Sequence, residues 1–276
     1  MNKLTTQKRT QVVAALVEGA SVNSVVRMTG VSKPTILKLL ADLGTACAKY
    51  QDEKLRNLPC KRVQADEIWS FCFAKDKNLS EEMKGKFGFG SVWTWTAICA
   101  DSKLMISWLV GERSVPYAVK FIDDLATRLA HRVQLTTDGH KAYLRAVEGA
   151  FGAEVDYAML EKIYAFPPQE GVTTRYSPAQ CCGAKKNKIT GNPDEAHVST
   201  GFAERMNLQI RMDMRRFTRL TNAHSKKIEN HRHALALYFM YYNFARIHST
   251  LRVTPAMQAG VATHVWSIEE IVKLLP

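Results

Sequence analysis

Several features are scarce or missing in this sequence, and each absence excludes a class of protein. No apolar run approaches the ~18 residues of a membrane span, and the N-terminal residues lack the apolar region of a signal peptide. The 276 residues include six scattered cysteines, too few for a disulfide framework, so we expect reduced thiols. The sequence therefore predicts a soluble cytoplasmic protein with no membrane partner.

Acidic residues are also few relative to basic ones. The chain has 26 Asp+Glu against 38 Lys+Arg, a formal net charge of +12, which indicates a polyanionic partner such as nucleic acid. Hydrophobic residues make up 46% of the chain, enough for a substantial core. The excess is local: residues 1–62 carry +7 and residues 205–232 carry +6, which leaves the rest nearly neutral.

The first fifty residues have the pattern of a helix-turn-helix domain. Three short amphipathic segments follow one another, and Ser21 and Ser32 are placed to cap the second and third, with Gly30 in the turn between them. The third helix would enter a DNA major groove with three outward residues, Lys33, Thr35 and Lys38. The alternative is a small helical cap without a partner.

After this domain the periodicity changes to that of a mixed α/β domain. β-branched and aromatic residues predict three successive antiparallel strands, and a helix over about 114–130 then leads to a buried strand that ends at Asp138. Two further helices are predicted over about 201–217 and 224–246. The predicted divisions are a helix-turn-helix domain (1–50), a linker (51–62), a catalytic α/β domain (63–250) with an irregular insertion (165–199), and a tail with short helices (251–276).

Three acidic residues occupy positions suited to chemistry. Asp66 lies inside the first strand, where a carboxylate is costly to bury unless it is paired or bound to metal. Asp138 ends a strand, at the edge where open α/β sheets place their sites, and Glu204 begins a helix. Three oxygen ligands without His or Cys suit Mg²⁺ or Mn²⁺, and the predicted reaction is phosphoryl transfer with two ions.

The helix that begins near residue 201 offers two adjacent faces. At 100° per residue one stripe is apolar, from Ala203 to Phe217. The neighbouring stripe carries Glu204, Asn207, Arg211 and Arg215, which suits a metal ion beside a DNA backbone. The alternative for Glu204 is a favourable interaction with the helix dipole alone.

Three strings of residues in this order resemble the DDE transposases of bacterial insertion sequences, most closely the insertion-sequence 1 family. They are Asp66-Glu67-Ile68-Trp69-Ser70, Thr137-Asp138-Gly139, and Glu204-Arg205-Met206-Asn207-Leu208 with the Arg-rich stretch after it. The stretch 214–222 and the tail 242–256 also look like that group. The resemblance extends over most of the chain.

The resemblance implies an RNase H-like fold with Asp66, Asp138 and Glu204 as catalytic, metal-binding residues. It also implies cleavage that exposes 3′-hydroxyls and their attack on target DNA, by a dimer or larger assembly that holds two DNA ends near the bacterial nucleoid. Asn207 matches a Glu-x-x-Asn pattern of the group. The DNA contacts expected from the second basic segment are Asn207, Arg211, Arg215, Arg216 and Arg219. The sequence departs from the group in lacking a zinc module before the catalytic domain.

Other interpretations remain open at this point. The long gap before Glu204 leaves Asp194 and Glu195 as alternative third acids, and Cys181, Cys182 and His197 as a weaker zinc site. The histidines at 231, 233 and 248 are predicted to lie on a solvated face or to contact DNA, and the aromatic residues of 235–244 to lie in the core. The functional alternatives are a helix-turn-helix regulator, a domesticated transposase without catalysis, and a nonspecific nuclease.

Overall fold

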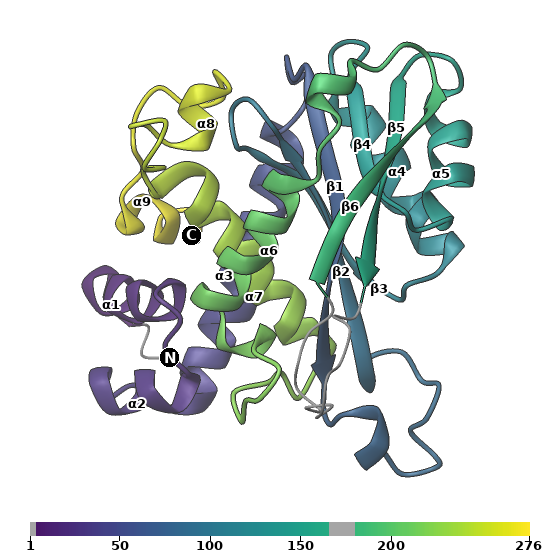
Figure 1. Ribbon diagram of the computed structural model, residues 1–276. Helices are drawn as coiled ribbons and strands as arrows, with labels where there is room; N and C mark the ends of the chain where they lie inside the picture. Colours follow the sequence, from purple (N-terminus) through teal and green to yellow (C-terminus); the bar gives the residue numbers. More distant parts are fainter. Residues whose placement is uncertain (1–3, 166–179) are drawn as a thin grey trace.

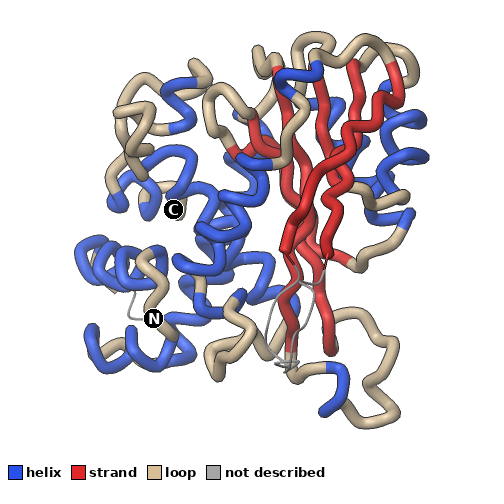
Figure 2. The backbone as a smooth tube through the Cα atoms, in the orientation of Figure 1, coloured by secondary structure: helices blue, strands red, loops and turns tan. Residues whose placement is uncertain are grey.

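One six-stranded mixed sheet forms the centre of the molecule. A computed structural model describes residues 4–165 and 180–276. In space the strands follow the order β3-β2-β1-β4-β5-β6 (Figure 2). Their bounds are β1 (Arg62–Cys72), β2 (Gly90–Cys99), β3 (Met105–Gly111), β4 (Gln134–Asp138), β5 (Asp156–Ala165) and β6 (Gln180–Thr190).

The strand directions give the fold class. β1, β2 and β3 form an antiparallel meander, whereas β1, β4 and β5 run parallel to one another. Parallel neighbours need a crossover, and the helix between β3 and β4 provides it. An antiparallel meander joined to parallel strands in this order, with flanking helices, is an RNase H-like α/β fold, as predicted.

The sixth strand corrects the expectation of an irregular insertion over 165–199. Residues 180–190 pair antiparallel with β5, while 166–179 lie outside the described residues. Side-chain patterning does not predict this strand, because residues 181–190 are mostly exposed and include three lysines. Backbone hydrogen bonds to β5 form it, and lysines are usual on an edge strand that must avoid further pairing.

Helices cover both faces of the sheet (Figure 1). Helices α3, α6 and α7 pack on one side, and α4 and α5 on the other. Their bounds are α1 (Thr6–Val17), α2 (Val22–Thr29), α3 (Lys33–Lys54), α4 (Val115–Arg128), α5 (Ala142–Phe151), α6 (Gly201–Asp213), α7 (Ile228–Met240), α8 (Pro255–Gln258) and α9 (Ile268–Val272). No helix in the described ranges combines the length and apolar character needed to cross a bilayer.

Three N-terminal helices form where the sequence predicts them, but the third is longer than expected, and Ser32 at its N-cap makes no side-chain cap hydrogen bond. Ser21 accepts a hydrogen bond from the Ser24 N–H, and Gly30 ends α2 with φ of 69°. Helix α3 continues to Lys54, so the first four residues of the expected linker are helical. Its second half packs against α7, and the buried side chains of α1, α2, α3 and the sheet form one continuous core.

The crossing of α3 and α7 depends on Gly44. A Cβ atom at this position would lie 2.5 Å from the His233 Cβ and 2.6 Å from its Cα. We expect G44A to lower the free energy of unfolding by about 1–3 kcal/mol, because overpacking outweighs the gain in helix propensity. The control is G149A in α5, where no atom lies within 4 Å of the new Cβ. Urea unfolding that ranks G44A as stable as G149A would contradict the close crossing.

His231 is a second correction, because it lies in the core and not on a solvated face. Its side chain is 0% exposed, and its ring nitrogens lie 3.3 Å from the Ser70 and Ser225 hydroxyls. Burial, and then the charges of Arg216 and Arg232, lowers the pKa of His231 to about 3. The aromatic prediction for 235–244 is confirmed: Tyr238, Tyr242 and Phe244 are buried.

The buried His231 predicts a pH-dependent stability. Its folded pKa lies below the unfolded value of ~6.5, so the unfolded chain takes up the proton first as the pH falls. Its contribution is complete above about pH 6.5 and falls by about 1.4 kcal/mol per pH unit toward pH 3. Urea unfolding at pH 7, 6 and 5 should show a smaller pH slope for H231Q than for wild type. Equal slopes would place the histidine in solvent.

Candidate active site

The carboxylates of Asp66 and Asp138 lie side by side at the centre of the sheet. Ala65 and Thr137 are the last paired residues of the parallel strands β1 and β4, and the two aspartates follow directly. With Glu67 they form a group in which one carboxylate oxygen from each residue lies within 4.8 Å of the other two. The His140 N–H donates a 3.0 Å hydrogen bond to Asp138 Oδ1. The fold thus brings together two of the three acids that the sequence singled out.

Helix α6 is fastened over β1 beside this group. The Gln64 side-chain oxygen accepts hydrogen bonds from the Phe202 and Ala203 N–H groups, at 2.7 and 3.2 Å. One turn further, Asn207 Nδ2 donates to Asp66 Oδ2 at 2.8 Å. Three residues of the predicted apolar stripe, Ala203, Met206 and Ile210, are buried on this helix. The helix ends at Asp213 and not near 217 as predicted, so the buried Met214 and Phe217 lie beyond it.

Glu204 lies near the two aspartates but outside the 4.8 Å group. Its carboxylate accepts hydrogen bonds from Lys162 of β5 and from the Thr200 hydroxyl. Its negative charge nevertheless contributes to raising the pKa of Asp66. The third acid therefore acts electrostatically on the same site, while its side chain is held by a neighbouring lysine.

The pKa of Asp66 shows that negative charge is concentrated here. Burial, and then the charges of Glu67, Asp138 and Glu204, together raise it to about 7, although a hydrogen bond from the Glu67 N–H lowers it in part. A carboxyl group with such a pKa is stabilised when a cation comes close. The site is therefore electrostatically suited to bind positive charge.

Four residues of the site were not assigned from the sequence: Glu67, Arg113, Tyr143 and Lys162. The Glu67 side chain is 1% exposed and accepts hydrogen bonds from Arg113 and from the Tyr143 hydroxyl. Arg113 also lies 3.7 Å from Asp138 and stacks over Trp93. One Glu67 oxygen still lies within 4.8 Å of oxygens of Asp66 and Asp138, and only the cost of burying a second acid in the same strand could have drawn attention to it.

The donor set fits a divalent metal ion. All candidate ligands are oxygen atoms, which hard ions such as Mg²⁺ and Mn²⁺ prefer. Asn207 supplies a further sign, because its Oδ1 is buried without a hydrogen-bond partner while its Nδ2 is bonded to Asp66. A buried carbonyl oxygen without a donor is rare in proteins, and a cation beside Asp66 would satisfy it.

The alternative ligands lie elsewhere. Asp194 exchanges hydrogen bonds with the Gln134 side chain through its backbone, at the start of β4, whereas Asp138 ends the same strand. Cys181 and Cys182 are exposed on β6. Among the described residues, the Asp66 group is the one set of three or more His, Cys, Asp or Glu arranged to share an ion.

The residues predicted to contact DNA differ in their exposure and in their contacts within the chain. Lys33, Thr35 and Lys38 are exposed on α3, where Lys38 pairs with Asp42 at 2.6 Å. Arg215 and Arg219 are exposed in the second basic segment.

Two arginines of that segment instead bind their own chain. Arg211 donates to the Phe217 carbonyl oxygen at 3.0 Å. Arg216 donates to the Ser225 hydroxyl at 2.6 Å and to the Asn230 carbonyl oxygen at 3.3 Å. Both guanidinium groups therefore hold the backbone that follows α6.

Comparison with known proteins gives structural similarity only. No family model and no curated protein matches the sequence. A cryo-EM structure of a piggyBac transposase synaptic complex with hairpin DNA is 11% identical, with a TM-score of 0.44 over 98% of this chain and 69% of that one. The crystal structure of the Mos1 strand transfer complex is 13% identical, with a TM-score of 0.25 over 57% of this chain and 59% of that one. TM-scores below 0.5 are too low to carry an assignment, so the fold class rests on strand order and direction.

Proposed function

We propose that this chain is a DDE transposase that binds the ends of its insertion element and catalyses metal-dependent DNA cleavage and strand transfer. One observation carries the proposal. Asp66 and Asp138 meet at adjacent positions of two parallel central strands, and Glu204 of α6 adds its charge to the same site. Polynucleotidyl transfer needs such an all-carboxylate site beside a surface that binds DNA.

The Mg²⁺ or Mn²⁺ ions would be held by Asp66, Asp138 and Glu204, and Asn207 Oδ1 would lie next to Asp66. When bound, two such ions activate the attacking oxygen and stabilise the leaving oxygen of an in-line displacement. The chain's own residues position these acids: Asn207 fixes Asp66, and the His140 N–H fixes one oxygen of Asp138. Arg113 offsets part of the negative charge through Glu67 and Asp138.

The two basic segments would bind double-stranded DNA, both element ends and target. Lys33, Thr35 and Lys38 lie exposed on α3, as base and phosphate contacts from a recognition helix require. Asn207, Arg211, Arg215, Arg216 and Arg219 follow the proposed catalytic acid along the chain, and Arg215 and Arg219 have the free guanidinium groups that phosphates need. Holding two ends together calls for a dimer or a larger assembly.

The alternative function is a helix-turn-helix regulator or a domesticated, inactive transposase. One observation favours it: Lys162 pairs with Glu204, and Arg113 pairs with Glu67, so side-chain cations already offset part of the negative charge. Such a protein would bind DNA and leave it intact with either Mg²⁺ or Mn²⁺.

The test uses the purified protein and DNA that carries the inverted repeats flanking its gene. With Mg²⁺ we expect cuts at the repeat boundary that leave 3′-hydroxyls, mapped on labelled strands. DNA of equal length with scrambled repeats is the control. Equal cutting of both DNAs would indicate a nonspecific nuclease, and binding without cutting would indicate the regulator.

A further inference from the structure

A cavity lies beside α6. Its volume is about 630 Å³, within the range of small-ligand sites. It is bounded by the start of α6, the turn between β2 and β3, and the segment that follows α7. Its polar and aromatic lining includes Lys103, Phe202, Arg205, Gln209, Arg246 and His248, and none of these residues belongs to the carboxylate site.

The charges around this cavity are of one sign. The cations Lys103, Arg205 and Arg246 line it beside the His248 ring, and the lining residues that the structure describes include no Asp or Glu. Arg246 is paired with Asp213 outside the cavity, but Arg205 has no ion-pair partner among the described residues. The pKa of His248 is lowered by burial and then by the charges of Lys103, Arg246 and Arg205, so all three cations act on the His248 ring. The charge of the lining therefore favours the binding of an anion in this cavity.

An aromatic ring stands beside these cations. Phe202 is 41% exposed at the start of α6. The Lys103 ammonium lies 3.3 Å from the ring centroid. An exposed ring next to a cationic cluster can stack on a planar group while the cations bind a phosphate, which is how proteins hold single-stranded nucleic acid.

The position of the cavity relates it to the carboxylates. On α6, Phe202, Arg205 and Gln209 lie on one flank of the buried stripe, and Glu204 and Asn207 lie on the other. A helix with its side chains is about 10–12 Å wide, the length that about three nucleotides cover at 3.4 Å each. A DNA strand that crosses α6 would therefore place a nucleotide near the cavity, about three positions from the phosphate that reacts.

We propose that this cavity binds one unstacked nucleotide, with its phosphate on Arg205 and Lys103 and its base against Phe202. The proposal rests on the proposed function in taking that nucleotide from a strand of the DNA substrate. A free nucleoside monophosphate has the same chemistry, and the test separates the two sources.

The test measures binding of fluorescein-labelled (dT)8 by anisotropy in EDTA, so that it depends on neither metal nor catalysis. We expect F202A to weaken binding about tenfold, and F202W to restore it. R205A should weaken binding and reduce the slope of log Kd against log salt by about 0.7, the value for one phosphate contact. K120A is the matched control, because Lys120 also lies over an aromatic ring, that of Tyr117, on the far side of the sheet.

Two further probes sharpen the result. An eight-unit abasic strand keeps the phosphates and lacks the bases, so wild type and F202A should bind it equally. If dTMP displaces (dT)8 from wild type but not from F202A, the cavity binds free nucleotides. If dTMP does not compete and only strands bind, the cavity binds nucleotides of DNA. Either result supports a nucleotide site.

The proposal is wrong if F202A binds (dT)8 like wild type, or if F202A loses the same affinity for the abasic strand. Loss of fold is checked by the thermal melting of each variant. Because this assay contains no metal, a failure of the DNA-cleavage experiment leaves its result unchanged, and the two outcomes remain distinguishable.

Discussion

Replacing Asp138 by Asn is expected to lower the rate of metal-dependent DNA cleavage on the order of a thousandfold or more and to leave DNA affinity nearly unchanged. One Asp138 oxygen lies within 4.8 Å of an oxygen of Asp66 and of Glu67. The amide removes one charge from the proposed metal ligands without changing the shape of the side chain. A loss of several kcal/mol in transition-state stabilisation corresponds to that rate. D66N and E204Q should behave in the same way.

The matched control for this series is D194N. Asp194 lies at the opposite end of β4, where its backbone is hydrogen-bonded to the Gln134 side chain. The D194N variant should therefore cut DNA like wild type. Cleavage is followed on labelled DNA with Mg²⁺, and affinity by gel shift in EDTA. If D66N, D138N and E204Q all cut at the wild-type rate, the three acids are not the catalytic set. If only E204Q does, the third ligand is another residue.

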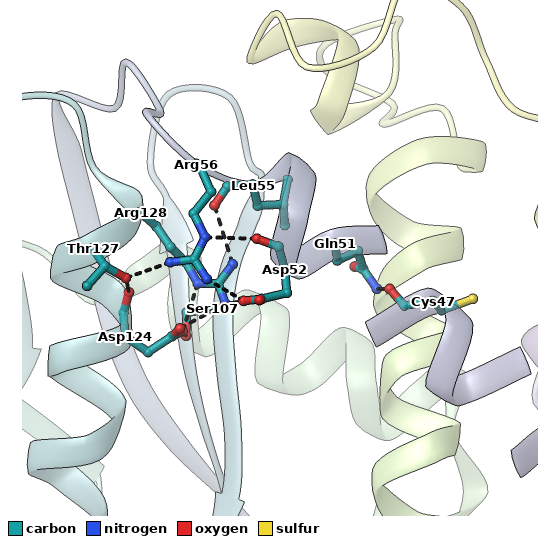
Figure 3. Close-up of polar contacts among 9 residues, drawn as sticks. All are labelled: Cys47, Gln51, Asp52, Leu55, Arg56, Ser107, Asp124, Thr127 and Arg128. Carbon is teal, nitrogen blue, oxygen red and sulfur yellow. Dashed lines mark hydrogen bonds and ion pairs between the residues drawn. The ribbon is translucent and has the colours of Figure 1, made fainter. Parts of the chain in front are cut away.

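The second large effect is expected at Arg128, where α3 meets the sheet. The R128M substitution should lower the free energy of unfolding by about 2–3 kcal/mol, because it removes the charged hydrogen bonds of a buried guanidinium and leaves the partly buried Asp124 without its ion-pair partner. Figure 3 shows the guanidinium between two acids of different elements. It donates to both oxygens of Asp124, at 2.7 and 2.8 Å, and to Asp52 at 2.7 Å. Its side chain is 9% exposed.

The pKa of Asp124 reports the strength of this arrangement. Burial alone would raise it, but hydrogen bonds from Arg128 and Ser107 outweigh burial and hold the pKa below its ordinary value. R132M is the matched control, since Arg132 pairs with acids on the surface and such pairs contribute little. Urea unfolding monitored by tryptophan fluorescence should separate the two variants clearly. Equal midpoints would show that Arg128 does not join the N-terminal helices to the core.

Much of the fold was predictable because local patterns report it. The strand meander, the crossover helix and the apolar stripe of α6 follow from side-chain periodicity, and the structure confirms them. β6 was missed because backbone pairing with an edge strand leaves no apolar alternation in the sequence. His231 was misplaced because its hydroxyl partner Ser70 comes from a strand 161 residues away.

The candidate site was only partly predictable for a related reason. Asp66 and Asp138 were found because an acid inside a strand and an acid at a strand end are both unusual. Arg113 reaches the site from the loop after β3, and Lys162 reaches it from β5. The residues next to them in the sequence do not indicate that either side chain belongs to the site. Contacts between distant segments follow from the sheet order, which single-residue patterns do not contain.

Strand transfer itself tests the central claim most directly. A DNA fragment that ends in the element's terminal repeat with a free 3′-hydroxyl is incubated with the protein, Mg²⁺ and a supercoiled plasmid. A transposase will join the 3′-end to the plasmid, and D66N and D138N will form no joined product. If wild-type protein binds the fragment but joins none of it with either Mg²⁺ or Mn²⁺, while D66N binds equally well, the chain is a DNA-binding protein and not a transposase.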